Sequence, residues 1–468
     1  MGSVYVTKRV NVCPKIMQPP KILKLSNLDR QCPTLMYLVF FYKFNPIYGG
    51  INYGNDSSIF SNLKDALEET LLLWYPAAGR LSRNPSDGRL DLWCNNQGAV
   101  MVEAVTQARV SDLGDDLSRY NELFESLVYK PVFSGDISDM PLLVAQMFLA
   151  CYVVLQILIL TKILVKANFN FLSAWASKAG LKQQGTKGLD QWHKPVHSRE
   201  RLLIPNSQKT PNKSMKNPLA RASAIQHLYQ LITQAAASDG GMNPQVFVPC
   251  TQQDCVLHTF HLSGLMIDNL KRRIYGLNNS CSSFEVLAAH LWKVSILQRL
   301  TWYPPPPSPS FLSIFGKLVK KVDTRTRLVP QLPQSFSGNA YVLASIAVSA
   351  GELEAASYEA IINKIKAAKN SVDNEYVSSY LEALEGSGGA LPPLRELTMV
   401  SDWTRTPYHK LNFMPHSQLA PVSACPLAPP LPQVAYFMQS PKEDKGIDVR
   451  IGLSPHILTP FSHYFLQL

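Results

Sequence analysis

The residue types best suited to chemistry in this chain are its eight cysteines and ten histidines, and they are widely scattered. The closest cysteine pair is Cys250 and Cys255, and no two cysteines form a C-x-x-C motif. No histidine pair lies beside them at the spacing of zinc ligands. Scattered cysteines are typical of reduced, buried side chains, so the sequence predicts no metal site and a cytoplasmic protein.

Two arginines near the middle of the chain are candidates for binding phosphate. Arg325 and Arg327 lie in the segment DTRTRLVP (323–330), and guanidinium groups bind phosphate oxygens through paired hydrogen bonds. The alternative is that both lie on a solvated loop. The formal net charge of +11 favours anionic partners. Because no run of five basic residues occurs, nucleic-acid binding is not expected.

Strand-like and helix-like periodicities alternate along the chain, which predicts an α/β fold. The chain has 468 residues, too many for one ordinary core. Residues 183–222 are rich in Lys, Pro, Asn and Ser and are predicted to be a crossover linker between domains at 1–182 and 223–468. The expected strands are 34–43, 89–94 and 99–104 with a hairpin within 431–454, and the expected helices are 57–73, 264–276, 282–300 and two within 351–385.

One stretch departs from this alternation. MFLACYVVLQILIL (147–160) has a single polar side chain, Gln156, and the uncharged stretch extends back to Pro141. The interval 141–160 is long enough for a membrane helix. The alternatives are a buried core element and an abnormal insert, with Cys151 as a small buried apolar residue. Because a membrane span would divide a globular domain, we favour the alternatives to membrane association.

Seven segments, in order, resemble the plant BAHD acyltransferases, which transfer an acyl group from coenzyme A to an alcohol or amine. The resemblance covers nearly the whole chain. It is carried by LSNLDRQCPTLMYLVFFY (25–42), LKDALEETLLLWYPAAGRL (63–81), DGRLDLWCNNQGAVMVEA (87–104), SSFEVLAAHLW (282–292), DTRTRLVPQLPQSFSGNA (323–340), SDWTRTPYHKLNF (401–413) and PLPQVAYFMQSPKEDKGIDVRIGL (430–453).

The resemblance implies a chloramphenicol acetyltransferase-like fold. Two similar domains of mixed β-sheet flanked by helices are joined by a crossover loop, with a solvent channel between them. It further implies a cytoplasmic, monomeric enzyme of plant secondary metabolism. Acyl-CoA would be a co-substrate rather than a bound cofactor, and the acceptor would be a small alcohol or amine. Hydroxycinnamoyl transferases are the most similar subgroup that we suggest.

The resemblance also places binding residues. Ser401, Trp403 and Phe413 are expected on the substrate side of the channel, although core packing is the alternative for Trp403. Residues 323–340 resemble the segment that lines the coenzyme A side. Arg325, Arg327 and Asn339 are therefore the expected coenzyme A-binding residues.

The family's catalytic base is the histidine of an H-x-x-x-D motif, which removes the acceptor's proton during attack on the thioester. None of the ten histidines is followed by Asp four residues later. The flanking segments place the motif between Gln146 and Phe169, where residues 147–168 contain no His, Asp or Gly. We therefore assign no catalytic residue in this chain.

The family's second motif, D-F-G-W-G, is also changed. Its position has the sequence Asn412-Phe413-Met414-Pro415-His416, so only the Phe remains. Pro415 removes a backbone donor and fixes φ where the family has glycine. His416 could substitute as the base, but the alternative is an ordinary solvated loop histidine.

The changed interval begins and ends abruptly, while its flanks match the family. This pattern favours alternative splicing or a gene-model error over gradual drift in a non-catalytic relative. We expect an impaired acyltransferase, and the alternative is a non-catalytic BAHD-like accessory or binding protein. Because residues 147–168 contain no turn residues, we also expect them not to form the hairpin that the family has there.

Overall fold

The fold is that of a computed structural model. The residues that the structure describes are 4–31, 35–44, 56–106, 117, 124, 127, 129, 136–149, 152–160, 167–184, 194–203, 256–276, 281–302, 315–386, 397–414, 419–427, 434–453 and 455–467.

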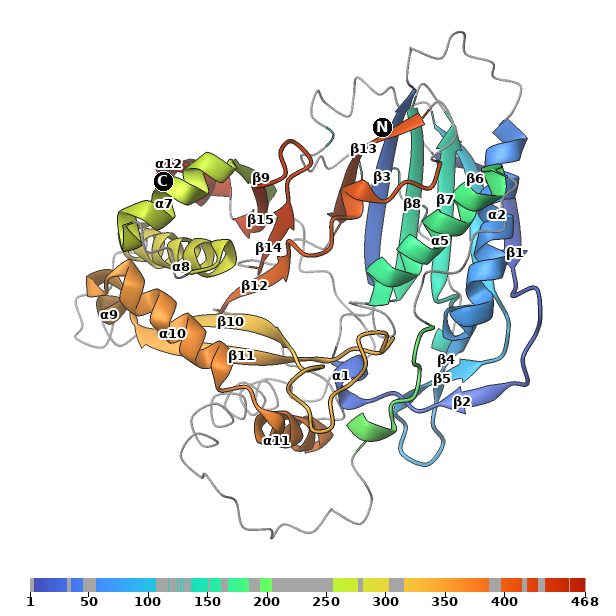
Figure 1. The fold of residues 1–468 in the computed structure, drawn as a ribbon, viewed down its shortest axis with the longest axis horizontal. Coiled ribbons are helices and arrows are strands. Elements are labelled where there is room, and N and C mark those ends of the chain that lie inside the picture. The colour runs from blue at the N-terminus through green and yellow to red at the C-terminus, as the bar shows by residue number, and fades with distance from the viewer. Residues whose placement is uncertain are drawn as a thin grey trace. The chain divides into compact units, whose positions relative to one another are not determined.

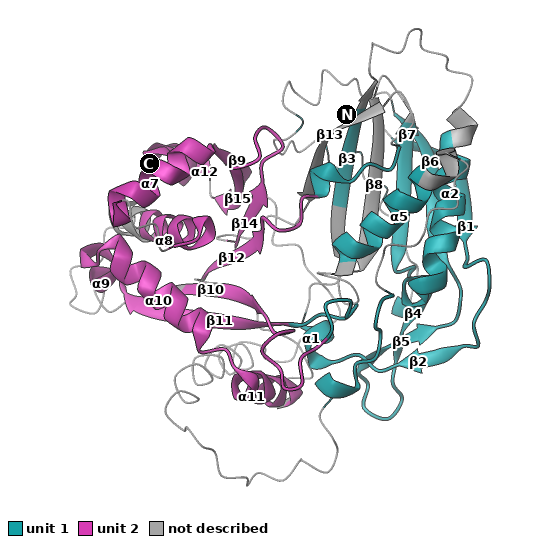
Figure 2. Cartoon of the chain, viewed as in Figure 1, with its two compact units in different colours: residues 1–204, 333–340, 408–428 teal, residues 205–332, 341–407, 429–468 magenta. Residues whose placement is uncertain are grey.

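The chain forms two compact units, each assembled from segments that are distant in sequence (Figure 2). Unit 1 contains residues 1–204, 333–340 and 408–428. Unit 2 contains the remaining segments, 205–332, 341–407 and 429–468.

A six-stranded sheet lies at the centre of unit 1, in the order β1-β6-β7-β8-β3-β13 (Figure 1). Its neighbouring strands pair antiparallel, except for β6 and β7, which are parallel. One face of the sheet contributes Val39, Phe41, Val102 and Val144 to a buried apolar cluster. The strands are β1 (Val4–Val12), β3 (Leu35–Phe44), β6 (Ala99–Thr106), β7 (Leu143–Leu149), β8 (Tyr152–Leu160) and β13 (Leu419–Leu427).

The position of the long apolar run in this sheet explains its composition. The run contains the end of β7 and all of β8, and β8 pairs with β7 on one side and with β3 on the other. Central strands of a sheet covered on both faces are expected to be continuously apolar, without polar alternation. The run is therefore sheet rather than helix. Within the described residues, no helix combines the length and apolarity needed to cross a membrane.

The expectation that this run cannot form a hairpin was wrong. β7 and β8 pair antiparallel from Leu143 opposite Ile159 to Leu149 opposite Val153. Strand pairing requires only backbone N–H and C=O groups, and every non-proline residue supplies both. The connecting residues 150 and 151, which include Cys151, lie outside the described residues.

Two helices lie side by side on one face of this sheet (Figure 1). They are α2 (Asp56–Leu73) and α5 (Ala167–Gln184). The indole of Trp175 on α5 donates a hydrogen bond to the carbonyl of Leu63 on α2, at 2.9 Å. Below them lies a small sheet in the order β2-β5-β4, with β2 (Lys21–Leu23), β5 (Leu90–Cys94) and β4 (Arg80–Arg83). The 3-10 helices of unit 1 are η3 (Tyr75–Ala78), η5 (Ile137–Asp139), η6 (Glu200–Leu202) and η10 (Tyr408–Lys410).

A buried carboxylate joins three distant segments of unit 1. Asp29, on the short helix α1 (Asn27–Arg30), is fully buried. It accepts hydrogen bonds from the backbone N–H groups of Asn339, at 2.9 Å, and Ser26, at 3.0 Å. It also pairs with Nε of Arg199 at 3.3 Å, and Arg199 donates to the carbonyl of His197. The N-terminal segment, residues 194–203 and residues 333–340 therefore meet at Asp29.

A second late segment also belongs to unit 1. Strand β13 pairs antiparallel with β3, from Leu419 opposite Phe44 to Leu427 opposite Tyr37. The sequence analysis placed 333–340 and 408–428 in the domain 223–468, whereas the structure packs both against N-terminal strands and helices. The linker at 183–222 remains a prediction, because most of it lies outside the described residues.

Unit 2 has its own six-stranded sheet, in the order β11-β10-β12-β14-β15-β9. β12 pairs parallel with β10 on one side and with β14 on the other, and the remaining neighbouring strands pair antiparallel. β14 and β15 form the expected closing hairpin. The strands are β9 (Val256–Leu262), β10 (Phe315–Asp323), β11 (Tyr341–Ser349), β12 (Leu397–Trp403), β14 (Val434–Gln439) and β15 (Ile447–Leu453).

Helices cover one face of the unit 2 sheet. Phe260 and Val449 alternate with polar residues along their strands, and together with Phe437 they pack with Leu287 and Trp292 of α8 in one buried cluster. The opposite face therefore carries the polar members of each strand. The helices are α7 (Gly264–Tyr275), α8 (Ser283–Trp302), α9 (Ala350–Ala355), α10 (Tyr358–Asn370), α11 (Asn374–Gly386) and α12 (Pro455–Leu466).

We expect Asp29→Asn to lower the free energy of unfolding by about 3–5 kcal/mol, because it leaves the buried Arg199 guanidinium without its counter-charge. Chemical denaturation of the purified chain measures this change. Glu354→Gln, which removes an exposed carboxylate, is the control and should stay within about 0.5 kcal/mol of the wild type. Equal denaturation midpoints for Asp29→Asn and the wild type would contradict the proposed role of Asp29.

Two buried histidines predict a loss of stability in acid. Nε2 of His197 donates to the carbonyl of Leu73 at 2.8 Å, and Nε2 of His290 donates to that of Phe465 at 3.0 Å. Their Nδ1 atoms accept from the hydroxyls of Ser337 and Tyr358. Burial lowers the pKa of each imidazole to about 4, against the ordinary value of 6.5.

Since the folded chain binds fewer protons than the unfolded chain, stability is fully present above about pH 6.5 and declines towards pH 4. At about pH 5 each histidine should cost roughly 2 kcal/mol. Denaturation midpoints measured at pH 7 and pH 5 test this, and His290→Gln should flatten the difference. A pH-independent midpoint between these values would show that the two imidazoles do not destabilise the folded state in acid.

Candidate functional site

The interval expected to hold the catalytic motif lies between two well-formed elements of unit 1. β8 ends at Leu160 and α5 begins at Ala167. Residues 161–166, between them, lie outside the described residues. Their sequence, TKILVK, contains no imidazole or carboxylate. The interval therefore retains the strand and the helix on its two sides but supplies neither an imidazole nor a carboxylate as a general base.

The face of the unit 2 sheet that lies opposite its helices brings two predicted substrate-binding residues together. Ser401 and Trp403 lie on β12, two residues apart, and therefore on the same face. The indole Nε1 of Trp403 donates to Oγ of Ser401 at 2.9 Å, and the Trp403 ring packs edge-on against Tyr436 at 5.5 Å. Because Ser401 Oγ accepts this bond, its own proton can be donated to another acceptor.

Three residues of this face were not identified from the sequence. Tyr436 lies opposite Ser401, and Arg450 lies opposite Tyr436 on the next strand. The buried Arg450 donates from Nε to the hydroxyl of Thr259 at 3.0 Å. Burial raises the pKa of Tyr436 to about 12, so its hydroxyl stays protonated. The alternation in IDVRIGL, with charges at every second residue, was the available signal for this polar face.

A histidine–aspartate pair lies farther along the same face. Nδ1 of His261 contacts Oδ1 of Asp448 at 2.8 Å, an arrangement that can orient a general base. Residue pairing places His261, Asp448, Met438 and Trp403 in one row across four strands. Three strand spacings separate His261 from Trp403, about 14 Å at roughly 4.8 Å each. This distance is too great for His261 to remove a proton beside Ser401, because a general base acts at hydrogen-bond distance.

Phe413, the third predicted substrate-binding residue, lies in the core of unit 1. Its ring packs edge-on against Trp175 at 5.1 Å and Phe40 at 5.5 Å. The hydroxyl of the buried Tyr42 donates to the carbonyl of Leu411 at 3.2 Å. The remnant of the second motif therefore anchors residues 411–414 to β3 and α5. His416, the suggested substitute base, lies outside the described residues.

The predicted coenzyme A-binding residues differ in accessibility. Arg325 is buried, and its Nη1 donates to both oxygens of Asp323, at 3.2 and 3.4 Å. Arg327 is half-buried at the surface of the same turn. Asn339 is buried in unit 1, where its backbone N–H donates to Asp29. Of the three, Arg327 is the best placed to contact a phosphate.

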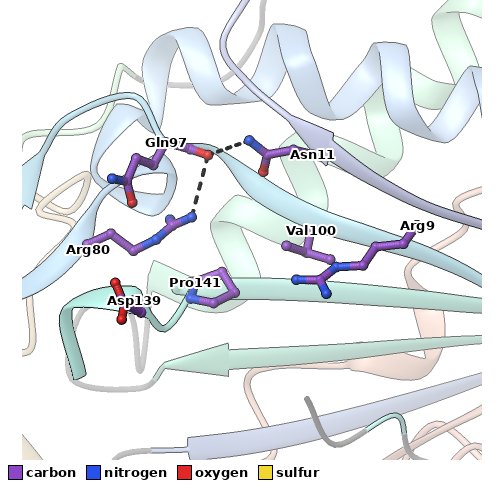
Figure 3. A pocket seen from close by; sticks show the side chains of 7 residues that line it. All are labelled: Arg9, Asn11, Arg80, Gln97, Val100, Asp139 and Pro141. Atoms are coloured by element: carbon purple, nitrogen blue, oxygen red, sulfur yellow. Dashed lines mark hydrogen bonds between the residues drawn. The ribbon is translucent and has the colours of Figure 1, made fainter. Parts of the chain in front are cut away.

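A surface pocket of about 300 Å³ opens beside β1 and β6 (Figure 3). Arg80 lies at its wall, and its Nη1 donates to the carbonyls of Gly79 and Gly98, at 2.7 and 2.8 Å. Asn11 donates to the carbonyl of Gln97 at 2.7 Å. These bonds join the loop at 97–98 to β1 and β4. The pocket is lined by Arg9, Asn11, Arg80, Gln97, Val100, Asp139 and Pro141.

The pocket and the described residues as a whole offer little for metal or nucleophile chemistry. The pocket lining contains no Ser, Cys or His. Among the described residues, no group of three or more His, Cys, Asp and Glu side chains could hold a metal ion. The polar face of the unit 2 sheet offers hydrogen-bond donors, among them Ser401 and Tyr436.

Comparison with known proteins gives the same fold and identifies the family. Vinorine synthase has a TM-score of 0.69 at 19% identity, covering 98% of this chain and 96% of that chain. The TRI101 protein of F. sporotrichioides, in complex with coenzyme A and T-2, has a TM-score of 0.67 at 13% identity, covering 94% and 97%. At these identities the similarity shows the fold alone, and it agrees with the α/β class expected from the sequence.

Sequence relatives extend over the whole chain. The brassinosteroid-related acyltransferase 1 of Arabidopsis thaliana is 43% identical, covering 99% of this chain and 98% of the relative. A hydroxycinnamoyltransferase of Narcissus pseudonarcissus is 26% identical, covering 99% of this chain and all of the relative. Residues 2–468 match the model of the Transferase family. The chain therefore belongs to this family, that of the plant BAHD acyltransferases.

Proposed function

We propose that this chain binds an acyl-CoA and a small plant alcohol or amine but transfers the acyl group slowly, because the catalytic base is missing. The observation that carries the proposal is the absence of H-x-x-x-D from the sequence, within a chain that otherwise matches the family throughout. Loss of a general base typically costs about 10²–10⁴ in rate, or roughly 3–5 kcal/mol of barrier. A cytoplasmic monomer remains our expectation for its state.

The chemistry that remains would be stabilisation of the developing oxyanion. The Ser401 hydroxyl is oriented by the Trp403 indole, and Tyr436 lies beside it as a protonated phenol. Donors held in place in this way lower the energy of the charge that forms on the thioester carbonyl oxygen. In the proposed reaction the acceptor's proton goes to water instead of an imidazole, and the acyl carbon leaves coenzyme A for the acceptor's oxygen or nitrogen.

The acceptor class follows from the relatives. Identity to the brassinosteroid-related acyltransferase is 43%, against 26% to the hydroxycinnamoyltransferase. Enzymes discriminate between acceptors through the residues that contact them, so relatives with different acceptors usually differ at these residues. We therefore propose a hydroxyl group of a brassinosteroid-related molecule as the acceptor, in place of the hydroxycinnamoyl transferase similarity suggested from the sequence.

A non-catalytic binding protein is the second candidate. The pairing of β7 with β8 favours it, because a folded sheet is required for binding without turnover. Sequencing transcripts across codons 140–175 tests whether residues 147–168 are encoded by every transcript or only by a variant. A major transcript encoding H-x-x-x-D identifies this chain as a variant of an ordinary enzyme. Transcripts that encode only residues 147–168 as given show that the motif is absent from the gene product and favour the second candidate.

Replacing residues 147–168 with the corresponding segment of a relative that contains H-x-x-x-D should raise kcat by about 10²–10⁴. The segment restores an imidazole between β8 and α5, where the present sequence has none. Release of coenzyme A from a panel of acyl-CoA donors, with hydroxylated steroids as acceptors, measures the rate. Product mass identifies the acylated group.

The matched control exchanges the exposed residues of helix α10 (Tyr358–Asn370) of unit 2 with those of the same relative, keeps the buried Ile361, Ile362 and Ile365, and should leave kcat unchanged. Melting temperatures of all three proteins separate slow chemistry from poor folding. If the unaltered chain turned over as fast as the repaired chimera, the proposed impairment would be wrong.

Arg327→Gln should weaken coenzyme A binding about tenfold, because one charge-assisted hydrogen bond to phosphate is lost. Isothermal titration of the purified chain with coenzyme A measures the Kd, and the melting temperature should not change. Lys364→Gln, which removes an exposed charge from α10, is the control. An unchanged Kd for Arg327→Gln would assign Arg327 to the solvated loop surface instead.

A further inference from the structure

The first 28 residues of the chain carry charge of one sign only. They contain Lys8, Arg9, Lys15, Lys21 and Lys24 and no Asp or Glu. Three of the lysines lie in KIMQPPKILK (15–24), here called the N-terminal ribbon, which leads into and includes β2. β2 is an edge strand of the small sheet β2-β5-β4 (Figure 1).

The N-terminal ribbon also exposes large apolar side chains. Ile16, Met17 and Ile22 are 70%, 67% and 64% exposed, and Trp93 of β5 is 41% exposed. Ile22 and Trp93 lie directly opposite each other on neighbouring strands. The alternate residue pair, Leu23 opposite Leu92, has Leu92 fully buried in the core. Ile22 and Trp93 therefore share the outer face of the small sheet.

Hydrogen bonds fix the loop that carries Ile16 and Met17 beside the end of β5. The side-chain amide of Asn96 donates to the carbonyl of Gln18 at 2.6 Å, and its oxygen accepts from the Gln18 N–H at 3.4 Å. Asn96 follows Trp93 by three residues, so the loop and the Ile22–Trp93 pair are neighbours. Isolated exposed apolar residues are ordinary, but grouped ones indicate an interaction surface.

The charges of the N-terminal ribbon remain close to this apolar group. Nζ of Lys15 pairs with Glu69 at 2.7 Å, and Nζ of Lys21 lies 4.3 Å from the ring centroid of Tyr75. Lys24 is exposed. Lysine stems extend along apolar surface while their ammonium groups reach outward. Tryptophan and lysine together are typical of side chains at a membrane–water interface.

We propose that the N-terminal ribbon and Trp93 dock unit 1 on the surface of an anionic lipid bilayer. The apolar side chains would enter the headgroup region, and Lys21 and Lys24 would face lipid phosphates and carboxylates, while Lys15 stays paired with Glu69. A nucleic-acid partner is disfavoured because base stacking needs several aromatic side chains, and only Trp93 belongs to this surface. An acidic protein partner would not require four exposed apolar side chains beside the lysines.

Cosedimentation of the full chain with vesicles tests the proposal. The vesicles are phosphatidylcholine alone, or phosphatidylcholine with phosphatidylserine. We expect binding to the anionic vesicles only, weakened at high salt because surface charges are then screened. Ile16→Ser with Met17→Ser, and separately Lys21→Gln with Lys24→Gln, should each reduce the partition coefficient by on the order of tenfold.

Matched controls come from unit 2. Leu265→Ser removes a side chain of equal exposure, 66%, and Lys364→Gln removes an exposed charge, so both should bind as the wild type does. Unchanged melting temperatures would show that the variants of the N-terminal ribbon fold. The proposal is overturned by absent vesicle binding, by equal binding to neutral vesicles, or by wild-type binding of both double variants.

Discussion

The backbone pairing of β8 is the constraint on which unit 1 depends. This strand lies between β7 and β3, and β3 in turn pairs with β13 from the end of the chain. If β8 were absent, β3 and β13 would be separated from β1, β6 and β7, and the sheet would gain two further unpaired edges, at β7 and β3. Unpaired N–H and C=O groups inside a domain cost too much to persist. A sequence that fills this position must be extended and apolar, and residues 152–160 are both.

This constraint explains how a chain can keep the sheet of the family while its sequence lacks the histidine that acyl transfer uses. The sheet requires backbone groups and apolar side chains at 147–160, and many sequences supply them. Acyl transfer requires one imidazole at one place, which no apolar substitution supplies. Under the proposed impairment, the 22 residues 147–168 satisfy the first requirement and fail the second. The expectation that residues 147–168 form no hairpin was wrong because it treated turn residues as necessary for strand pairing.

The local sequence pattern predicted the individual helices and strands but not how they assemble. The helix expected at 57–73 is α2 (Asp56–Leu73), and the strand expected at 89–94 is β5 (Leu90–Cys94), because the periodicity of each element is encoded within its own segment. The pairing of β13 with β3 joins residues more than 370 positions apart, and no local signal specifies it. For this reason, two late segments were placed in the wrong half of the chain.

The same distinction applies to the candidate site. Ser401 and Trp403 are two apart on one strand, so their shared face followed from the sequence alone. Tyr436, Arg450 and Thr259 join that face only through the registers of β12 with β14, β14 with β15, and β15 with β9. Phe413 shows the opposite case, since its place in the motif suggested substrate contact and its packing against Trp175 and Phe40 gives it a role in the core. A motif residue can persist because it anchors a segment, so its presence is weaker support for catalysis than a hydrogen-bonded polar group on the sheet face opposite the helices.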